Sequence, residues 1–431
     1  MTLLFDAAYL LALLVAWPLL LYRRWRRGPG SLSLGERLGR VPPRPVAASC
    51  VWLHGVSLGE INATRTIVEE LRRRSPDTVV VVSSTTQTGL TQARNLYPQL
   101  CVLRFPLDLS FAVRAAMDRL RPSVIVLMEL EVWPNLLRVA AARDIPVLIA
   151  NGRVTDNRTM RAFRMPILRK LARSMFGSLR WVGAQDAGYA ARFIELGVAA
   201  ARVEITGSVK YDTAPLTDRV DGQEQLAEAM TIDPRRPLWV CGSTGGGEES
   251  IILDAYDRLL REYPELQLAI IPRKPESFDE VADLIVQRGY ACLRRSGKPP
   301  RVPAEPVSPR PVFLGDTMGE LRRFYGLATL VFVGRTLVPL GGSDVMEVAG
   351  MGKAMIFGPH TENFAEAADA LLEAQAARRV ATPAGLRGAV DELLKDPQRR
   401  AAMGAAAREV VQQRRGATAR TVEMILALAR R

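Results

Sequence analysis

Short apolar runs rich in Val, Ile and Leu alternate with stretches of helical periodicity along most of this chain. A strand of a parallel sheet is buried on both faces and is joined to the next strand through a helix, so the alternation predicts open α/β sheets. The runs form two sets on either side of a polar stretch. We therefore expect two Rossmann-like domains that face a cleft, residues 28–212 and 238–431, with residues 213–237 as the linker.

The first set of runs contains Val51 to Leu53, Val79 to Val82, Val124 to Met128, Val147 to Ala150 and Trp181 to Ala184. The second set contains Leu238 to Cys241, Leu268 to Ile271, Val312 to Leu314, Leu330 to Val333 and Ala354 to Phe357. The last stretch of the chain, Pro397 to Arg431, has helical spacing, and in this architecture such a helix often crosses back onto the first domain.

The amino terminus predicts a membrane anchor at residues 1–27. The stretch from Leu3 to Tyr22 is apolar except for Asp6, and twenty helical residues rise about 30 Å, the thickness of a bilayer's hydrocarbon core. The arginine-rich stretch Arg23 to Arg27 follows, which by the positive-inside rule places the rest of the chain in the cytoplasm, against the inner leaflet of the inner membrane. Because Pro18 interrupts the apolar stretch, a shallow anchor in one leaflet is the alternative.

The composition limits the classes of function. With 431 residues, 48% of them hydrophobic, the chain can bury two cores. The net charge is +13, but the 58 Lys and Arg are spread along the chain and only 6% of residues are aromatic, which argues against binding of nucleic acid. Binding to an anionic membrane surface or to a phosphorylated substrate explains the positive charge at least as well as nucleic-acid binding does. The four cysteines lack the spacing of metal ligands, which predicts reduced thiols and no metal site.

The segment Gly341 to Phe364 predicts a pocket for a phosphate and a sugar. Gly341 and Gly342 follow an apolar run, permit a tight turn, and offer N–H groups to an anion at a helix start. Glu347 lies one turn inside that helix, where a carboxylate can accept hydrogen bonds from ribose hydroxyls. An ordinary strand, turn and helix is the alternative.

Two further stretches predict contacts with an anion. The glycine-rich stretch Cys241 to Glu248, which includes Ser243, follows a strand and leads into a helix, so its backbone can surround an anion. Pro272 and Arg273 end another strand, and a guanidinium can form a bidentate pair with phosphate. Without other motifs, such glycine loops are more often plain turns.

Carboxylates and a lysine follow strands of the first domain. Glu60 lies near a helix start and is the candidate general base, with a helix-capping role as the alternative. Glu129 and Glu131 follow the run Val124 to Met128, and strand alternation would point both side chains the same way, with structural ion pairs as the alternative. Lys210 follows another strand-like run and, taken alone, is a surface lysine.

Several stretches together resemble the bacterial 3-deoxy-D-manno-octulosonic acid (Kdo) transferases, which glycosylate lipid A precursors. Their order and spacing cover nearly the whole chain. The resemblance implies a glycosyltransferase of the GT-B type, with two Rossmann-like domains. The matching stretches are VWLHGVSLGE at 51–60, MELEVWPN at 128–135, NGR at 151, GSVKYD at 207, IPRKPESF at 271, GDTMGEL at 315–321 and the Gly341 to Phe364 segment.

The resemblance also implies roles for individual residues. Glu60 falls on the general base, Glu129 on a residue that stabilises the transition state, and Lys210 on a residue that meets the donor's phosphate or carboxylate. The expected acceptor-binding residues are Ser57, Gly59, Arg37 and Arg40. The expected donor-binding residues, which hold cytidine monophosphate, are Ser243, Pro272, Arg273, Met318, Gly319, Glu320, Gly341, Gly342, Asp344, Val345, Met346 and Glu347.

This chain departs from the family pattern beside the predicted nucleotide. The family usually has His then Asn after the glycine pair and Pro on either side of the Leu-Glu step, His at two further positions, and Thr between the two glutamates. An Asn-to-Asp change adds negative charge beside a phosphate, so the donor's identity is less secure than the fold. The departures are Leu130, Gly245, Lys274, Ser343, Asp344, Val345, Met346 and Val348.

The expected function is therefore inverting transfer of Kdo from cytidine monophosphate Kdo (CMP-Kdo) to a hydroxyl of the lipid A precursor lipid IVA, in lipopolysaccharide core biosynthesis. Without an Asp-x-Asp motif or a metal-ligand cluster, we expect no metal and no cofactor. A transferase or epimerase of the same fold that uses another nucleotide sugar is one alternative. A catalytically silent membrane-bound scaffold is the other.

Overall fold

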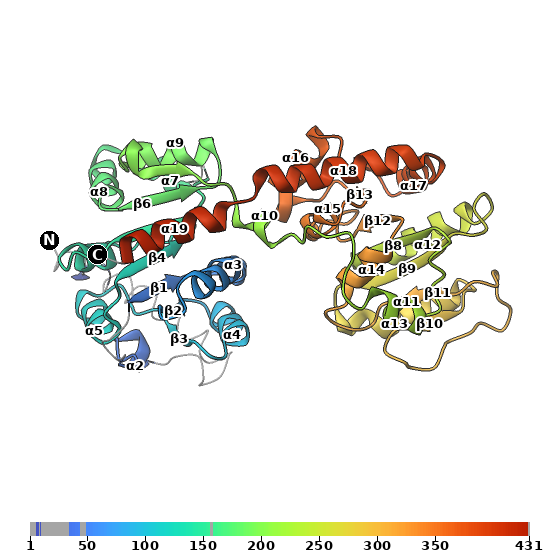
Figure 1. Cartoon of the computed structure of the whole chain (residues 1–431), viewed down its shortest axis with the longest axis horizontal. Helices are drawn as coiled ribbons and strands as arrows, with labels where there is room; N and C mark the ends of the chain where they lie inside the picture. Colours follow the sequence, from blue (N-terminus) through green and yellow to red (C-terminus); the bar gives the residue numbers. More distant parts are fainter. Residues whose placement is uncertain (1–5, 8, 10–33, 44–48, 156–157, 430–431) are drawn as a thin grey trace. The chain divides into compact units, whose positions relative to one another are not determined.

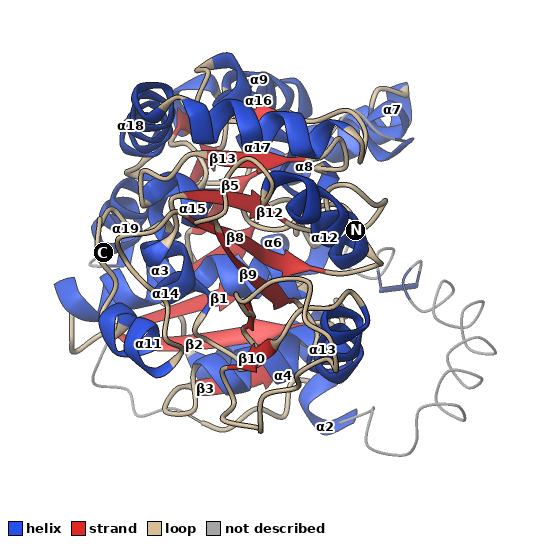
Figure 2. Cartoon of the chain, turned by 90° about the vertical axis from the view of Figure 1, so that its right-hand side faces the viewer, coloured by secondary structure: helices blue, strands red, loops and turns tan. Residues whose placement is uncertain are grey.

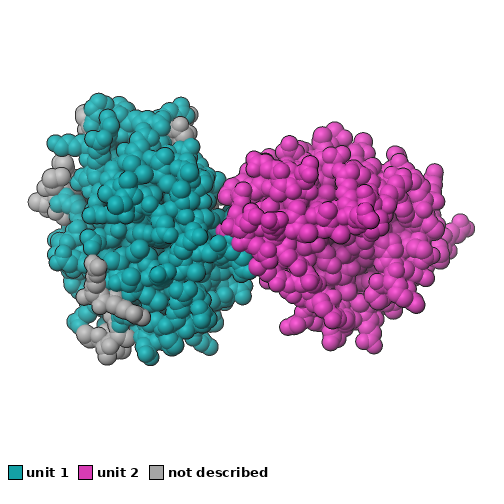
Figure 3. Space-filling model, turned by 45° about the horizontal axis from the view of Figure 1, so that its top comes forward, with its two compact units in different colours: residues 1–212, 415–431 teal, residues 213–414 magenta. Residues whose placement is uncertain are grey.

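The computed structural model describes residues 6–7, 9, 34–43, 49–155 and 158–429. Within this part the chain divides into two compact units, residues 1–212 with 415–431 and residues 213–414 (Figure 3). Each unit is built around one seven-stranded sheet whose strand pairs are all parallel (Figure 2). The prediction of two open α/β sheets is therefore confirmed.

The sheet of unit 1 has the strand order β3-β2-β1-β4-β5-β6-β7. The predicted apolar runs all lie in its strands because Val, Ile and Leu are buried there on both faces, as in β1 and β4. The strands are β1 (Cys50–His54), β2 (Val79–Ser84), β3 (Cys101–Arg104), β4 (Val124–Met128), β5 (Val147–Gly152), β6 (Trp181–Ala184) and β7 (Val203–Ile205). The helices are α2 (Leu34–Arg37), α3 (Leu58–Arg74), α4 (Gln87–Leu96), α5 (Ser110–Leu120), α6 (Pro134–Ala141), α7 (Arg158–Phe163), α8 (Pro166–Phe176), α9 (Ala187–Leu196), η2 (Ala200–Arg202), α10 (Val209–Thr213) and α19 (Ala417–Ala429).

The sheet of unit 2 has the order β10-β11-β9-β8-β12-β13-β14, with the longer strands at its centre. Its strands are β8 (Leu238–Thr244), β9 (Gln267–Pro272), β10 (Cys292–Arg294), β11 (Val312–Leu314), β12 (Leu330–Val333), β13 (Met355–Phe357) and β14 (Arg378–Arg379). The helices are α11 (Gln223–Ala229), α12 (Glu248–Leu259), η3 (Pro275–Ser277), α13 (Phe278–Gln287), α14 (Leu321–Leu327), α15 (Met346–Gly350), η4 (Glu362–Phe364), α16 (Ala365–Glu373), α17 (Gly385–Lys395) and α18 (Pro397–Arg414).

The two sheets share a topological switch. In unit 1 the chain runs outward from β1 to β3 and then returns to the other side of β1 as β4. In unit 2 it passes from β8 to β9, to the edge strand β10 and back inward to β11, and then crosses to the other side of β8 as β12. The loops that follow β1 and β4, and those that follow β8 and β12, therefore diverge at the carboxyl edge of each sheet. Open α/β sheets bind ligands at this position.

The boundary at the start of unit 2 differs from the predicted linker, whereas the expected return of the last helix to the first domain is confirmed. Residues 213–237, expected as a linker, belong to unit 2 and contain α11, which packs against α14. Unit 2 ends at residue 414, and the chain returns to unit 1 as α19, which packs against α3, β1 and β4 (Figure 1). Ala417, Val422 and Ile425 of this helix are buried in the core of unit 1.

The predicted membrane anchor and Arg23 to Arg27 lie outside the described residues, except for a few positions. Within the described ranges, no helix is both long and apolar enough to cross a bilayer. Asp6 is one of the described positions. Its carboxylate accepts hydrogen bonds from the Ser110 N–H (2.8 Å), the Ser110 hydroxyl (2.6 Å) and the Asn135 side-chain amide (3.0 Å). Asp6 thus contacts the starts of α5 and α6.

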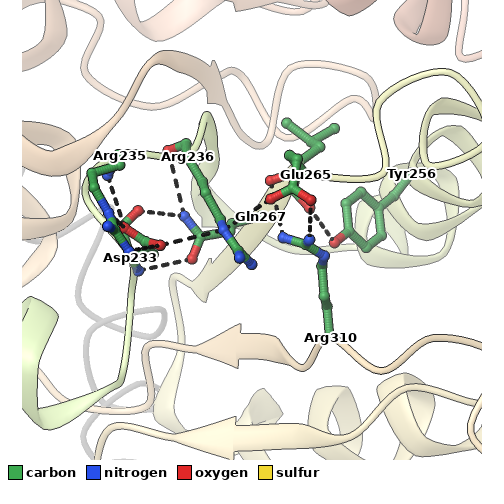
Figure 4. Close-up of polar contacts among 8 residues, drawn as sticks. Asp233, Arg235, Arg236, Tyr256, Glu265, Gln267 and Arg310 are labelled. Carbon is green, nitrogen blue, oxygen red and sulfur yellow. Dashed lines mark hydrogen bonds and ion pairs between the residues drawn. The ribbon is translucent and has the colours of Figure 1, made fainter.

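A polar cluster joins the loops that enter β8 and β9, at the amino edge of the unit 2 sheet (Figure 4). The Gln267 side-chain amide donates to the Asp233 carbonyl (2.8 Å), and the Asp233 N–H donates to Gln267 Oε1 (3.0 Å). Glu265 pairs with both Arg236 (2.9 Å) and Arg310 (2.7 Å). These contacts fix the strand starts, opposite the edge where the predicted donor-binding residues lie.

Candidate active site

Glu60 lies in the first turn of α3, on the loop that follows β1, and is 8% exposed. It forms a capping box with Ser57, because the Ser57 hydroxyl accepts from the Glu60 N–H (3.2 Å) while the Glu60 carboxylate accepts from the Ser57 N–H (3.2 Å). The carboxylate also accepts from the Val56 N–H at Oε2 (2.9 Å) and from the Ser57 hydroxyl at Oε1 (2.8 Å). The capping alternative therefore describes part of what Glu60 does.

Ser57 and Gly59, predicted to bind the acceptor, belong to this same turn. Ser57 is the N-cap of α3 and its hydroxyl is committed to Glu60. A Cβ on Gly59 would meet only Ser57 Oγ, at 3.8 Å, which is ordinary van der Waals contact. The protein's own packing thus does not require glycine at position 59, and any requirement would come from a ligand.

The alternation argument for Glu129 and Glu131 is wrong, because β4 ends at Met128. Glu129 adopts φ of 56°, in the left-handed region that costs a non-glycine residue about 1–2 kcal/mol. Its N–H still donates to the Ala150 carbonyl of β5 (3.0 Å), so the residue stays against the sheet edge. Strained backbone of this kind is concentrated at functional sites.

The carboxyls of Glu129 and Glu131 nevertheless lie in one electrostatic cluster with that of Glu60. Burial, followed by the charge of Glu60, raises the pKa of Glu129, and Arg153 and Lys210 act in the opposite direction. Burial and, to a smaller extent, the negative charges of Glu60 and Glu129 raise the pKa of Glu131 to about 7. Glu131 is thus a carboxyl that changes its charge near neutral pH.

Arg37 and Arg40, the other predicted acceptor-binding residues, lie elsewhere in unit 1. The Arg37 carbonyl accepts from the Leu107 N–H (2.8 Å), and burial lowers the pKa of the Arg37 guanidinium beside Tyr9. Arg40 is exposed. Glu36 of α2 accepts a hydrogen bond from the Arg104 N–H (3.2 Å) of the edge strand β3, and β2 separates this strand from β1 and Glu60.

In the glycine-rich stretch after β8, the side chain of Glu248 accepts a hydrogen bond from the backbone of the stretch itself. Glu248 is fully buried, and its carboxylate accepts hydrogen bonds from the N–H groups of Gly245 (3.3 Å), Arg335 (2.5 Å), Thr336 (2.8 Å) and Leu337 (2.9 Å). Within the predicted anion-binding stretch, Glu248 thus takes up the Gly245 N–H, and an anion at the other glycines of this stretch stays a prediction. Glu248 also ties together the two loops of the switch point.

Ser243 lies where β8 loses its register with β9, and its φ is 57°. Asn151 has the same conformation, with φ of 54°, where β5 loses its register with β6. Bulges of this kind re-aim the chain at a strand end and are frequent beside active sites.

The Gly341 to Phe364 segment contains the predicted turn. Gly341 and Gly342 have φ of 80° and 81°, and a Cβ on either would approach Asn363 Nδ2 (2.5 Å) or the His360 carbonyl (2.9 Å). The left-handed backbone favours glycine at both positions, and at Gly342 the backbone carbonyl of His360 also leaves no room for a Cβ. Asp344 Oδ1 accepts from the Met346 N–H (2.9 Å), which starts α15.

The remaining predicted donor-binding residues of this segment have protein partners. Val345 and Met346 are 0% and 1% exposed and are packing residues. Glu347 pairs with Arg322, which donates from Nε (3.1 Å) and Nη2 (3.0 Å). A ribose hydroxyl would therefore share the Glu347 carboxylate with this arginine.

Pro272 and Arg273 end β9 beside the bulge of β8, where the Arg273 N–H donates to the Thr244 carbonyl (3.0 Å). The Arg273 side chain is exposed and forms no ion pair within the described residues. A phosphate in front of β8 and β9 would thus find a cation at this edge.

The turn before α14 holds Met318, Gly319 and Glu320. Met318 is 65% exposed, and Gly319 has φ of 87° with open space where a Cβ would be. Glu320 accepts from Arg295 (3.0 and 2.9 Å) and from Thr317 (2.5 Å). Burial raises the pKa of Glu320, but these hydrogen bonds lower it more, so the net pKa lies below the usual value. The ionised carboxylate therefore holds the turn in place.

Comparisons with known proteins identify the family. A sequence profile described as 3-deoxy-D-manno-octulosonic-acid transferase (Kdo transferase) matches residues 33–213. The 3-deoxy-D-manno-octulosonic acid transferase of Bordetella pertussis is 34% identical over 97% of this chain and 98% of its own length. That of Haemophilus influenzae is 32% identical over 88% of both chains.

This chain belongs to the Kdo transferase family. It is accordingly a glycosyltransferase, as the motif order predicts. Among solved structures, the UDP-GlcNAc 2-epimerase from Neisseria meningitidis bound to UDP-GlcNAc is 13% identical, covers 88% of this chain and 100% of its own, and gives a TM-score of 0.57. At that identity the likeness shows the fold, which is that of the GT-B enzymes.

In this Kdo transferase, unit 1 brings together Glu60, Glu129, Glu131 and Lys210, and unit 2 places Ser243, Arg273 and the Gly341 turn along one sheet edge. Sequence reasoning missed the roles of Asn151 and Glu248. For Glu248, the run of glycines before it was a usable signal of a special turn. Its partners lie almost ninety residues further along the chain, at 335–337, and no local pattern predicts that pairing.

Proposed function

We propose that this Kdo transferase moves Kdo from CMP-Kdo to a hydroxyl of lipid IVA, with inversion at the anomeric carbon and with Glu60 as the general base. The observation that carries the proposal is the carboxyl cluster of Glu60, Glu129 and Glu131 at the switch point of unit 1. The names of the curated relatives support the transferred sugar.

The hydrogen bonds of Glu60 are compatible with a base. A carboxylate has about four lone-pair directions. Val56 and Ser57 occupy one at Oε2 and two at Oε1, which leaves one direction at Oε2 for an acceptor hydroxyl. The same bonds hold the carboxylate in a single orientation, as a positioned base requires.

The proposed reaction is a single displacement. The acceptor oxygen forms a bond to the anomeric carbon, its proton passes to Glu60, and the bond to the phosphate oxygen of cytidine monophosphate breaks with its electron pair on the phosphate. Positive charge that develops on the sugar ring is stabilised by Glu129, and Lys210 offsets negative charge on the substrate.

Unit 2 supplies the residues for the nucleotide. Arg273 is the exposed cation at the sheet edge, and the Gly341 and Gly342 turn brings backbone close to a ligand. Asp344 is the departure that adds charge here, and its contact with the Met346 N–H turns one of its oxygens toward the protein. We propose that this reduces the repulsion of a phosphate.

We also propose that the chain is held at the cytoplasmic leaflet of the inner membrane by residues 1–27, with the positive charge of Arg37 and Arg40 favouring an anionic acceptor. This proposal is supported by the apolar stretch and by the arginines that follow it. Sedimentation of the full chain with anionic vesicles, compared with a chain that starts at residue 28, tests it, and equal sedimentation would contradict it.

The decisive experiment incubates the full chain with CMP-Kdo and tetraacylated lipid A precursor and measures the mass of the lipid product. We expect a gain of one or more Kdo units. Glu60→Gln should lower kcat by roughly 10²–10⁴-fold while donor binding, measured by calorimetry, is retained. The control is Glu69→Gln on the same helix, where the carboxylate is exposed and pairs with Arg65.

Three results would contradict the proposal. Product formation with uridine-linked sugars instead of CMP-Kdo would point to another nucleotide-sugar enzyme of this fold. No product with any donor would favour the scaffold alternative. An unchanged kcat in Glu60→Gln would leave Kdo transfer standing and remove Glu60 as its base.

A further inference from the structure

Asn151, at the end of β5, links the loop that follows this strand to the helix that carries Lys210. Its side chain is 1% exposed, and Oδ1 accepts from the Val209 N–H (3.2 Å) and from the Ser208 hydroxyl (3.4 Å). An N–H can only donate, so the atom that faces Val209 must be the amide oxygen. Asn151 thereby fixes the first turn of α10, next to Lys210.

The backbone around Asn151 is held to two neighbouring elements. Its carbonyl accepts from the Gln185 side-chain amide (2.9 Å), and the preceding carbonyl, that of Ala150, accepts from the Glu129 N–H (3.0 Å). Glu129 therefore lies beside the strand end that holds Asn151. Arg153 follows two residues later in the same loop.

Two cations from different elements act on Glu129. Arg153 comes from the loop after β5 and Lys210 from α10, and both favour the ionised form of the Glu129 carboxyl against burial and the charge of Glu60. Both cations are exposed. Arg153 Nε also donates to the Tyr189 hydroxyl (3.3 Å), which holds the guanidinium at this edge.

An anionic group of a substrate that approaches the carboxyls of Glu60, Glu129 and Glu131 is repelled unless cations stand beside them. Kdo transfer brings such groups to the enzyme, because the sugar is an acid and the acceptor is phosphorylated. The Asn151 Nδ2 group adds a donor, since it is buried and has no hydrogen-bond partner among the described residues.

The resemblance already implies that Lys210 meets an oxyanion of the donor. We propose that Arg153 is a second cation of this subsite, and that Asn151 positions the first turn of α10, which carries Lys210. The inference rests on the proposed function. The shared chemistry is that of a carboxylate or a phosphate, which the donor sugar and the acceptor lipid respectively supply.

The test compares Arg153→Gln and Arg153→Lys with the control Arg143→Gln in the full chain, with CMP-Kdo and tetraacylated lipid A precursor varied in turn. Arg143 precedes β5, at its other end, and pairs with Asp118 (2.8 Å). Charge-assisted hydrogen bonds predict a rise of roughly 10- to 100-fold in one KM for Arg153→Gln, a smaller rise for Arg153→Lys, and none for Arg143→Gln. A rise in the donor's KM identifies the carboxylate, and a rise in the acceptor's KM identifies the phosphate.

A second readout separates binding from mere support of the loop. Without Arg153, the ionised form of Glu129 loses a stabilising cation, so its pKa goes up. The acidic limb of kcat/KM should therefore move to higher pH in Arg153→Gln and stay in place in Arg143→Gln. Asn151→Gly tolerates the left-handed backbone but loses the contact with Val209, so it should raise the same KM as Arg153→Gln.

The outcomes distinguish this inference from the proposed function. Wild-type protein that transfers no Kdo would overturn both. Active wild-type protein with both KM values within twofold in Arg153→Gln, and an unmoved pH profile, would overturn the subsite alone. A poorly folded Arg153→Gln, detected by thermal unfolding, would leave the decision to Arg153→Lys, whose unchanged KM and pH profile would also overturn it.

Discussion

The Asp212 carboxylate holds the start of α19 against unit 1. Oδ1 accepts from the Gly416 N–H (2.7 Å) and Oδ2 from the Thr418 N–H (2.6 Å), and the side chain is 10% exposed. Anions at a helix start also interact favourably with the helix dipole. We predict that Asp212→Ala loosens α19 while the sheet of unit 1 and the whole of unit 2 stay folded.

The size of the effect follows from these contacts. A hydrogen bond to a charged group contributes about 1.5–3 kcal/mol. In Asp212→Ala, water can partly replace the hydrogen bond of the Gly416 N–H, because Gly416 is half-buried. Water can replace less of the bond of the Thr418 N–H, because Thr418 is 7% exposed. A loss of about 2–4 kcal/mol is therefore expected, which makes the detached form of α19 roughly 30- to 1,000-fold more populated.

Hydrogen exchange followed by mass spectrometry on the full chain measures this directly. Peptides from residues 417–429 should exchange faster in Asp212→Ala by that factor, while peptides from α18 keep their wild-type rates. The matched control is Asp218→Ala, which removes an exposed carboxylate that pairs with Arg408. Equal protection of α19 in the Asp212 variant and the wild type would refute the capping argument.

Two further predictions concern buried carboxyls. Glu248→Ala leaves the N–H groups of residues 335–337 without their acceptor, so the free energy of unfolding of unit 2 in urea should fall by about 3–6 kcal/mol. The control Asp254→Ala, on the same helix, should lower it by less than about 1 kcal/mol. Equal urea midpoints for the two variants would contradict this prediction. The pKa of Glu131 is raised from 4.5 to about 7, chiefly by burial, so its protonated form favours folding. Relative to Glu131→Gln, the wild type should lose on the order of 1–2 kcal/mol of unfolding free energy as the pH rises from about 4.5 to about 7, as measured by thermal unfolding. The same pH dependence in the wild type and the variant would exclude the raised pKa of Glu131.

Local patterns were sufficient for the strands and for the special turns. The apolar runs predicted the central strands because burial on both faces leaves a continuous signal. The glycine pair at 341 and 342 predicted left-handed backbone, which the structure confirms at both residues. The spacing of Ser57 and Glu60 is itself the signature of a capping box.

Contacts between distant segments could not be predicted in the same way. The pairing of Glu347 with Arg322 joins α15 to α14 and occupies a carboxylate that the sequence alone leaves open to ribose. The end of β4 at Met128 depends on the left-handed Glu129, and a glutamate carries no local signal for that conformation. Asn151 was part of a matching motif, but its role depends on Val209, far along the chain.

The place of α19 has a consequence for biosynthesis. Because Ala417, Val422 and Ile425 complete the core of unit 1, the first unit to leave the ribosome cannot finish its interior until α19 has been translated, after all of unit 2. A nascent chain that lacks α19 exposes the apolar side chains of α3 and β4 against which this helix packs. Synthesis that stops just short of residue 417 should therefore yield a species that needs a chaperone, although all of unit 2 is already present.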